Sequence, residues 1–203
     1  MDIGFWYNLE MTDNQEPQSL PEGVTFLDSG ADSFVYLSEG DVVKVYKKES
    51  PEKIRLYQQL TDQVARLLNN DPTVYQIGIG GKPYSYTISV NPIKHVGEDP
   101  RFPGKVTSVS EYIPGPHISG LFPPEVPFDG LTFSNQVNPY LDILSDQLNN
   151  KFGFKGISIL EPNVKFKFDP NNKIPISLII TDLSSHLWAL EPANPPTQPG
   201  PPA

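Results

Sequence analysis

The sequence contains no cysteine among its 203 residues. This excludes disulfide bonds, thiolate metal sites and a cysteine nucleophile. Basic residues are scarce too, with 15 Lys and Arg against 24 Asp and Glu and a formal net charge of -9. Binding to nucleic acid or to an anionic membrane surface depends on clustered Lys and Arg. The charge balance therefore argues against both of these partners.

Long apolar runs and paired metal ligands are also missing. No stretch reaches the roughly 18 apolar residues of a membrane-spanning helix, and residues 1–17 lack the basic start and apolar centre of a signal peptide. The three histidines, His95, His117 and His186, stand far apart, without the spacing of a zinc site. We expect a soluble, cytoplasmic protein without bound zinc.

Proline, with 23 residues, and glycine mark out the organisation of the chain. Residues 1–22 are expected to be a polar N-terminal extension, and residues 191–203 a proline-rich, disordered tail. A connector rich in proline and glycine begins at residue 114. The sequence therefore predicts two lobes, residues 23–113 and residues 114–190.

The spacing of apolar residues predicts an α+β fold. Residues 23–48 contain three short β-rich runs separated by turns with glycine and aspartate, which is typical of an antiparallel meander. An amphipathic helix is expected over residues 51–69, with Ser50 as its N-cap, and two further strands over residues 84–90 and 105–113. The first lobe is thus predicted to be an antiparallel sheet of about five strands with one helix.

The second lobe is predicted to hold one helix and one hairpin. Apolar residues at helical spacing indicate a helix over residues 138–153, and Gly153 is expected to end it. Residues 163–169 and 174–180 are expected to be two strands joined by a tight turn.

Three polar residues stand out from their surroundings. Lys44 lies within the apolar strand VVKVY, where its ammonium group either reaches an exposed face or meets an anion. Asn163 follows a proline and precedes a strand, which is a place for a turn residue or for a ligand. Asp182 follows the apolar run SLII, as a turn residue, as the N-cap of a short helix over residues 183–190, or as a ligand of a bound cation.

In this order, the elements and the polar residues resemble the protein-kinase-like fold, and most closely its aminoglycoside- and choline-type phosphotransferase branch. The resemblance spans residues 23 to about 190 and implies a two-lobed molecule that binds ATP and Mg²⁺. In such enzymes a turn covers the phosphates, a strand lysine contacts them, the segment joining the lobes meets the adenine, and an Asn and an Asp hold Mg²⁺. The matching residues here are, in the same order, Gly30, Lys44, Glu111 to Ile113, Asn163 and Asp182.

The catalytic loop departs from the pattern of this branch, which reads approximately H-G-D-x-x-x-x-N. Counting back from Asn163 puts Gly156 at the histidine and Ser158 at the aspartate. A serine hydroxyl is neither charged nor basic at neutral pH, so it does not replace the catalytic acid. Glu161 is the nearest carboxylate, and its shift along the chain moves it away from the expected phosphate acceptor.

Two further departures concern the helix and the second lobe. The helix over residues 51–69 offers no obvious inward glutamate to pair with Lys44, because Glu52 lies in its first turn and Asp62 lies off the apolar stripe. Only the 21 residues 183–203 follow Asp182, and most of them belong to the tail. We therefore expect a much reduced second lobe, without the helices that bind the acceptor.

Three functions remain open on these grounds. The first is a catalytically impaired, nucleotide-binding protein that acts as a binding or regulatory module. The second is an active phosphotransferase acting on a small molecule or a protein, since phosphoryl transfer depends mainly on positioning and on cations. The third is an interaction domain that binds no nucleotide. A protein partner or a second copy of the chain is expected at the reduced lobe, where the apolar segment 118–128 lies.

Overall fold

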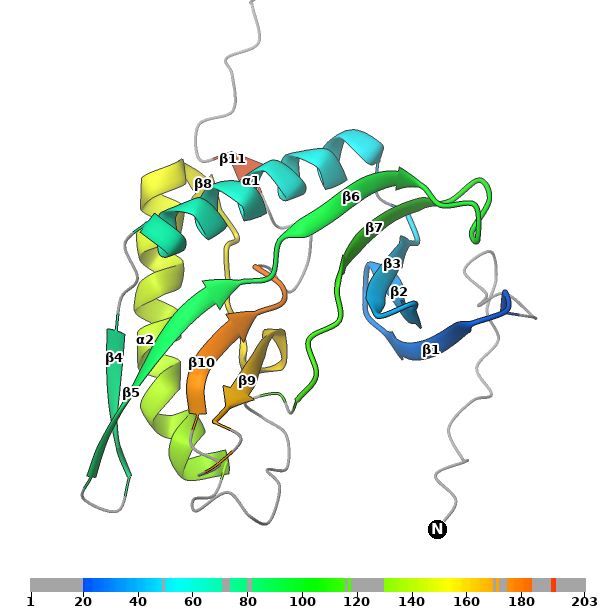
Figure 1. Ribbon diagram of the computed structural model, residues 1–203. Helices are drawn as coiled ribbons and strands as arrows, with labels where there is room; N and C mark the ends of the chain where they lie inside the picture. Colours follow the sequence, from blue (N-terminus) through cyan, green and yellow to red (C-terminus); the bar gives the residue numbers. More distant parts are fainter. Residues whose placement is uncertain are drawn as a thin grey trace, which may run out of the picture.

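The computed structural model describes residues 20–48, 50–70, 74–79, 82–115, 117, 130–169, 171, 175–183 and 191–192. The described residues form one five-stranded sheet, one four-stranded sheet, a two-stranded ribbon and two α-helices. The fold is α+β, as the sequence predicts (Figure 1).

The first sheet is antiparallel throughout. The predicted meander is confirmed, and its second turn places Glu39 and Gly40 at positive φ angles of 54° and 83°, a conformation that glycine adopts without strain. In spatial order the strands are β1 (Val24–Ser29), β2 (Ser33–Ser38), β3 (Asp41–Tyr46), β7 (Val106–Glu111) and β6 (Ile93–Glu98).

The second sheet contains a strand that the sequence had placed in the first. In spatial order its strands are β4 (Val74–Ile79), β5 (Lys82–Val90), β10 (Pro175–Ile180) and β9 (Val164–Phe168). The prediction that residues 84–90 belong to the first sheet is wrong, because β5 pairs in parallel with β10. The fifth strand of the first sheet is β6 instead.

The chain passes from one sheet to the other at Asn91 and Pro92. The Asn91 N–H donates to the carbonyl of Ile180 over 2.8 Å, which continues the pairing of β5 with β10. Pro92 has no N–H to offer and ends that pairing, after which β6 joins β7. Figure 1 shows β5 and β6 as two arrows that follow one another along a curved path and link the two sheets.

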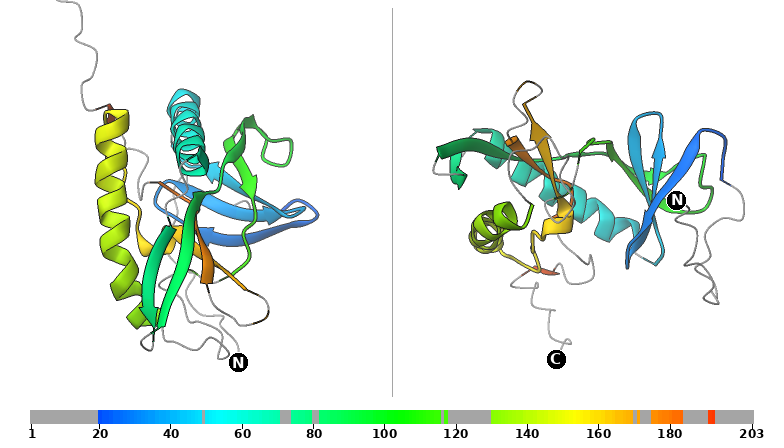
Figure 2. Two further views of the ribbon diagram at one scale, coloured as in Figure 1. Left: turned by 60° about the vertical axis from the view of Figure 1, so that its left-hand side comes forward. Right: turned by 90° about the horizontal axis from the view of Figure 1, so that it is seen from below.

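Two helices lie beside the second sheet (Figure 2). α1 (Pro51–Asn70) begins as predicted, with the Ser50 hydroxyl accepting from the Lys53 N–H over 3.2 Å. α2 (Gly130–Phe152) starts earlier than predicted and includes Pro139 in its interior. It ends before Gly153, whose φ of 65° suits a helix C-terminus.

Short elements complete the described chain. β8 (Phe154–Lys155) pairs with β11 (Glu191–Pro192), and the short 3-10 helix η1 (Glu161–Asn163) leads into β9. Neither α1 nor α2 combines the length and the apolar character that crossing a bilayer requires. The apolar segment 118–128, His186 and almost all of residues 184–203 lie outside the described residues.

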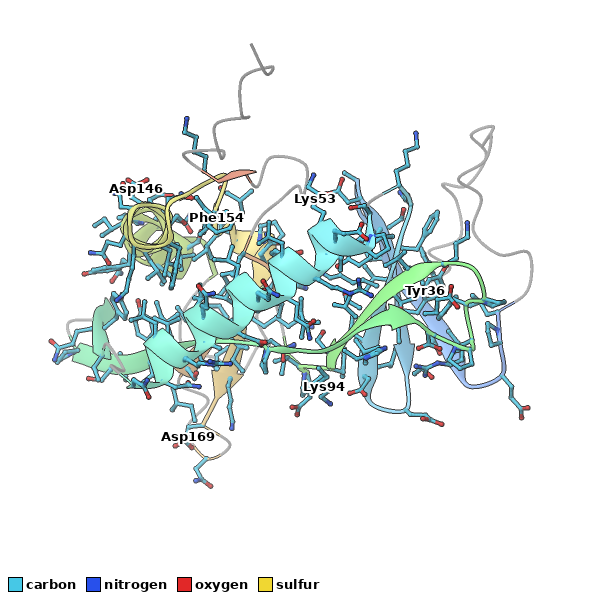
Figure 3. All side chains as sticks on the ribbon, turned by 90° about the horizontal axis from the view of Figure 1, so that it is seen from above. Tyr36, Lys53, Lys94, Asp146, Phe154 and Asp169 are labelled. Atoms are coloured by element: carbon cyan, nitrogen blue, oxygen red, sulfur yellow. The ribbon has the colours of Figure 1, made fainter. Side chains whose placement is uncertain are left out.

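The larger of two apolar cores joins both sheets. It combines Tyr46 of β3 with buried residues of α1, α2 and the second sheet, among them Ile54, Leu141 and Phe166. In Figure 3, α1 runs from the first sheet, near the labelled Lys53, toward β4 and β5, while α2 is seen nearly end-on. The smaller core lies on the first sheet around Tyr36. The larger core therefore contains buried residues from both sheets and both helices.

Candidate functional site

A cleft of about 410 Å³ lies between the first sheet and the ends of β9 and β10. The strands of the first sheet supply one wall, and the hairpin of the second sheet supplies the other. All the residues that the sequence assigned to nucleotide or metal binding line this cleft, namely Gly30, Lys44, Glu111, Ile113, Asn163 and Asp182.

An ion pair across the cleft joins the two sheets. Lys44 Nζ, on β3, lies 2.6 Å from Oδ2 of Asp182, which is the second residue after β10. Burial by itself lowers the pKa of Lys44, but the Asp182 carboxylate and smaller contributions from Tyr46 and Asp32 outweigh it and raise the pKa above its ordinary value. Lys44 therefore carries its charge at neutral pH. Its partner, which the sequence left unassigned, is Asp182.

Tyr57 of α1 holds the second oxygen of Asp182. Its hydroxyl donates to Asp182 Oδ1 and accepts from the Leu183 N–H over 2.8 Å. Burial, followed by the negative charge of Asp182, raises the pKa of Tyr57 well above its ordinary value, so the phenol stays protonated and keeps donating. Sequence reasoning missed this residue because Tyr57 falls on the apolar stripe of α1; a hydroxyl within that stripe is the signal that could have found it.

The surroundings of Lys44 are polar as well. Tyr46 Oη and Ser108 Oγ share a hydrogen bond of 2.9 Å, and the Thr61 hydroxyl donates to the Tyr57 carbonyl over 2.8 Å. These residues line a small cavity of about 10 Å³ beside the ion pair, which is close to the space that one water molecule needs. The ammonium group is thus placed among hydroxyls as well as against a carboxylate.

Asn163 and Asp182 are brought together by the ends of neighbouring strands. The Asn163 carbonyl accepts from the Thr181 N–H over 2.7 Å and from the Thr181 hydroxyl over 3.1 Å. These two hydrogen bonds hold the chain just before β9 against the chain just after β10. Asn163 and Asp182 are therefore close together. Carboxylate and amide oxygens are the hard ligands that Mg²⁺ accepts from proteins, usually one or two per ion with water and phosphate oxygens. The donor set fits Mg²⁺.

The turn between β1 and β2 is closed by its own contacts. The Gly30 N–H donates to the Ser33 carbonyl over 2.9 Å, and Lys47 Nζ donates to the Gly30 carbonyl over 2.7 Å. A Cβ on Gly30 would meet only the Ser33 carbonyl, at 3.8 Å. Gly30 lines the cleft, but its N–H is already used within the turn.

Residues 111–113, called the hinge segment below, border the cleft at the end of β7. Asn91 Nδ2 donates to the Glu111 carbonyl over 2.9 Å, and Lys165 Nζ donates to the Ile113 carbonyl over 2.8 Å. The same ammonium lies 5.0 Å from the centre of the Tyr112 ring. Two carbonyls of the hinge segment thus already accept hydrogen bonds from side chains.

The two residues considered for the catalytic base do not reach the cleft. The Ser158 N–H donates to the Leu183 carbonyl over 2.9 Å. The Glu161 carboxylate accepts hydrogen bonds from Ser134 and Asn138, so it is turned toward α2. Neither residue is among those that line the cleft.

Comparisons with known proteins find structural similarity alone. A scan against models of protein families finds no match, and neither does a search of curated proteins. Two double-mutant forms of the PknI kinase domain from Mycobacterium tuberculosis match with 14% and 15% identity and TM-scores of 0.38 and 0.39. The matches cover 88% and 87% of this chain but 63% and 65% of the PknI structures, so the chain spans less than two thirds of their length.

A phosphotransferase structure also matches. A GDP and kanamycin complex of APH(2")-IIia has 13% identity and a TM-score of 0.38, with coverage of 83% of this chain and 70% of that chain.

Proposed function

We propose that this chain is a kinase-like protein that binds a nucleotide with Mg²⁺ and does not transfer its phosphate efficiently. It would act as a nucleotide-dependent binding or regulatory module. The observation that carries this proposal is the convergence of Lys44, Asn163 and Asp182 in one cleft. The volume of the cleft, about 410 Å³, lies within the usual range of small-molecule sites.

Each of the three side chains offers what a nucleotide phosphate with Mg²⁺ requires. Lys44 supplies a point charge for phosphate oxygens. Asp182 and Asn163 would hold Mg²⁺, which supplies charge neutralisation of the phosphates when bound. The ion pair of 2.6 Å keeps the Lys44 ammonium and the Asp182 carboxylate at the same end of the cleft. Both groups are thus in place before Lys44 meets a phosphate and Asp182 meets Mg²⁺.

The proposal that phosphate transfer is inefficient rests on where the acidic side chains of the cleft lie. Besides Asp182, the acidic residues that line the cleft are Asp28 and Asp32, near the β1–β2 turn, and Glu111, in the hinge segment. None of these belongs to the loop before β9, which supplies the base in the phosphotransferase pattern. Efficient transfer to a hydroxyl group benefits from a positioned base, and Ser158 offers none.

Thermal unfolding tests the binding. Nucleotide with Mg²⁺ should raise the melting temperature of the wild type, since a ligand at a hundred times its Kd stabilises the native state by about 2.7 kcal/mol. Lys44→Met and Asp182→Asn should each abolish the shift. Lys94→Met is the matched control, because Lys94 is paired with Asp41 over 2.7 Å outside the cleft, and it should keep the shift. A wild type that responds to no nucleotide would instead support an interaction domain.

Turnover separates this proposal from an active phosphotransferase. Incubation of the protein with γ-labelled nucleotide, Mg²⁺ and aminoglycoside, choline or protein acceptors should give no labelled product above the level of the Asp182→Asn variant. A product that appears with the wild type and disappears with Asp182→Asn would make the chain an active enzyme. If Glu161→Gln retained that activity, Glu161 would be excluded as its base.

A module of this kind would bind a partner in the cytoplasm differently with and without nucleotide. The partner is either another protein or a second copy of the chain. Light scattering of the purified protein, with and without nucleotide, measures the second case directly as a change in molar mass.

A further inference from the structure

α2 binds the chain that leads to β9 at every second residue of the segment 157–161, called the anchored loop below. The Asn149 side chain accepts from the Ile157 N–H over 3.0 Å and donates to the Ile157 carbonyl over 2.8 Å. The Ser145 hydroxyl accepts from the Ile159 N–H over 3.0 Å. Both contacts satisfy backbone groups of residues that belong to no helix or strand. α2 therefore fixes the path of the anchored loop toward the cleft.

The last contact of the anchored loop is made by a carboxylate. Ser134 and Asn138, one turn apart on α2, both donate to Glu161 Oε1, and the Asn138 amide also donates to the Ser134 hydroxyl over 3.3 Å. Ser134 is buried, Glu161 and Asn138 are half-buried, and no basic side chain of the described residues is paired with Glu161. Removing a carboxylate from water is costly unless donors satisfy its oxygens. The two donors of α2 therefore hold Glu161 in place.

Glu161 is separated from the proposed metal ligand Asn163 by one residue, within η1. The Asn163 N–H donates to the Leu160 carbonyl over 2.8 Å and closes this turn. On the other side, the Asn163 carbonyl accepts from Thr181 of the neighbouring chain segment. The backbone of Asn163 is thus held from two directions, by Thr181 after β10 and by α2 through Glu161. A metal ligand that its surroundings hold in this way offers its oxygen at a fixed place.

We propose that Glu161 is a positioning residue for Asn163 and acts through its hydrogen bonds to Ser134 and Asn138. This inference rests on the proposed function, because it requires Mg²⁺ between Asn163 and Asp182. None of the described residues of α2 lines the cleft. The helix nevertheless takes part in metal binding, because it sets the position of the turn that presents Asn163. Loss of a partner that orients a metal ligand typically lowers metal affinity by about 10- to 100-fold.

Calorimetric titration with and without Mg²⁺ tests this role, using ATP or GTP, whichever raises the melting temperature more. The two titrations give the factor by which the metal tightens nucleotide binding. In Glu161→Met, which removes the acceptor, this factor should fall by about tenfold or more, while the affinity for the metal-free nucleotide should stay that of the wild type. Asn138→Asp sets a second carboxylate against Glu161 and should have the same effect.

An exchange of donor and acceptor provides the rescue. In the double variant Glu161→Gln with Asn138→Asp, the new amide donates to the new carboxylate, so most of the Mg²⁺ factor should return. Asn149→Ala is the matched control, because it breaks a contact of the same kind at the other end of the anchored loop. It should lower the melting temperature and keep the Mg²⁺ factor.

The outcomes separate this inference from the function on which it rests. If Glu161→Met and Asn138→Asp are folded by circular dichroism and keep the wild-type factor, the inference is overturned while the proposed nucleotide and metal binding stands. An equal loss in Asn149→Ala would show a general effect of a weakened fold and would overturn it too. If the wild type binds no nucleotide, or binds it without any effect of Mg²⁺, the proposed site fails and this inference with it.

Ser134→Ala covers the case in which the other single variants do not fold. It removes one of the two donors and places a strong helix-forming residue in α2. Its Mg²⁺ factor should also be lower than that of the wild type. An unchanged factor in this variant would then count against the role of Glu161.

Discussion

Two side chains from different elements hold Asp182, Lys44 on β3 through Oδ2 and Tyr57 on α1 through Oδ1. Tyr57 contacts the ion pair from α1, the helix in which the sequence offers no obvious inward glutamate. A neutral phenol fixes the orientation of the carboxylate without adding a second negative charge beside Lys44. The charge of Lys44 is therefore balanced by Asp182, the same residue that is proposed to hold the metal.

Removal of the Tyr57 hydroxyl tests this arrangement. Tyr57→Phe leaves the buried Leu183 N–H without its acceptor, which should reduce the free energy of unfolding by about 1–3 kcal/mol. Urea denaturation measures it. Tyr84→Phe on β5, a half-buried tyrosine outside the cleft, is the control and should change stability by less than about 0.5 kcal/mol. Equal stability of Tyr57→Phe and the wild type would mean that the hydroxyl does not hold Asp182.

Sequence reasoning singled out Lys44 and Asp182 and missed neutral residues around the cleft, such as Tyr57 and Asn91. Lys44 and Asp182 stand out because a charge within or directly after an apolar strand needs a reason. Tyr57 and Asn91 do not stand out, since a tyrosine on an apolar stripe and an asparagine before a proline are common. Their roles depend on contacts between residues far apart in the chain.

At the scale of elements, the loop after β6 is held by an acid and an arginine close in sequence. Asp99 accepts from Arg101 Nη2 over 2.6 Å and from Arg101 Nε over 2.8 Å, and Arg101 Nη1 also donates to the Ser38 hydroxyl. This places Phe102 against Tyr36, with ring centres 4.8 Å apart. The loop thereby closes the smaller core on the first sheet.

Acid unfolding should reveal this contact. The hydrogen bonds from Arg101 lower the pKa of Asp99 below its ordinary value, so the unfolded chain binds the proton more readily than the folded one. The contribution is fully present above about pH 4 and is lost as the pH falls through the lowered pKa. Asp99→Asn should therefore lower stability at pH 7 and make stability fall less steeply below pH 4.

Urea denaturation at a series of pH values from about 2 to 7 provides the measurement. Asp142→Asn, at an exposed position of α2, is the control for the loss of one carboxylate. An acid branch that is as steep in Asp99→Asn as in the wild type would rule out this role for Asp99.

Most elements were predictable from local patterns, but their assembly into sheets was not. The meander, α1 and the hairpin of β9 and β10 follow from apolar spacing and from turn residues within each segment. β4 and β6 were missed, and β5 was assigned to the wrong sheet, because the parallel pair of β5 and β10 joins segments far apart in the chain. The start of α2 was missed because Pro139 lies inside the helix, whereas a proline is usually tolerated only in the first turn.

At the scale of the whole molecule, the larger core makes one folding unit of both sheets. Ile54 of α1 is fully buried within it, together with Tyr46 of β3 and Leu178 of β10. The sheets are further linked by Asn91, which bonds to Ile180 of the second sheet and to Glu111 of the first. We therefore expect a single cooperative unfolding transition.

Truncation of one core residue tests whether both sheets unfold together. Ile54→Ala should cost about 2–5 kcal/mol and should speed amide hydrogen exchange in β3 and in β10 alike. Ile143→Ala, at a residue of α2 that is 54% exposed, should change stability by less than about 0.5 kcal/mol. Faster exchange confined to one of the two sheets would show that they unfold as separate units.

The Mg²⁺ dependence of nucleotide affinity tests the proposed nucleotide and metal site, and isothermal titration calorimetry measures it. In the wild type, Mg²⁺ should tighten binding at one site per chain, because Asp182 and Asn163 offer it oxygen ligands in the cleft. In Asp182→Asn the tightening should disappear, because the carboxylate ligand is gone. Absence of nucleotide binding to the wild type, or the same effect of Mg²⁺ in both proteins, would contradict the account.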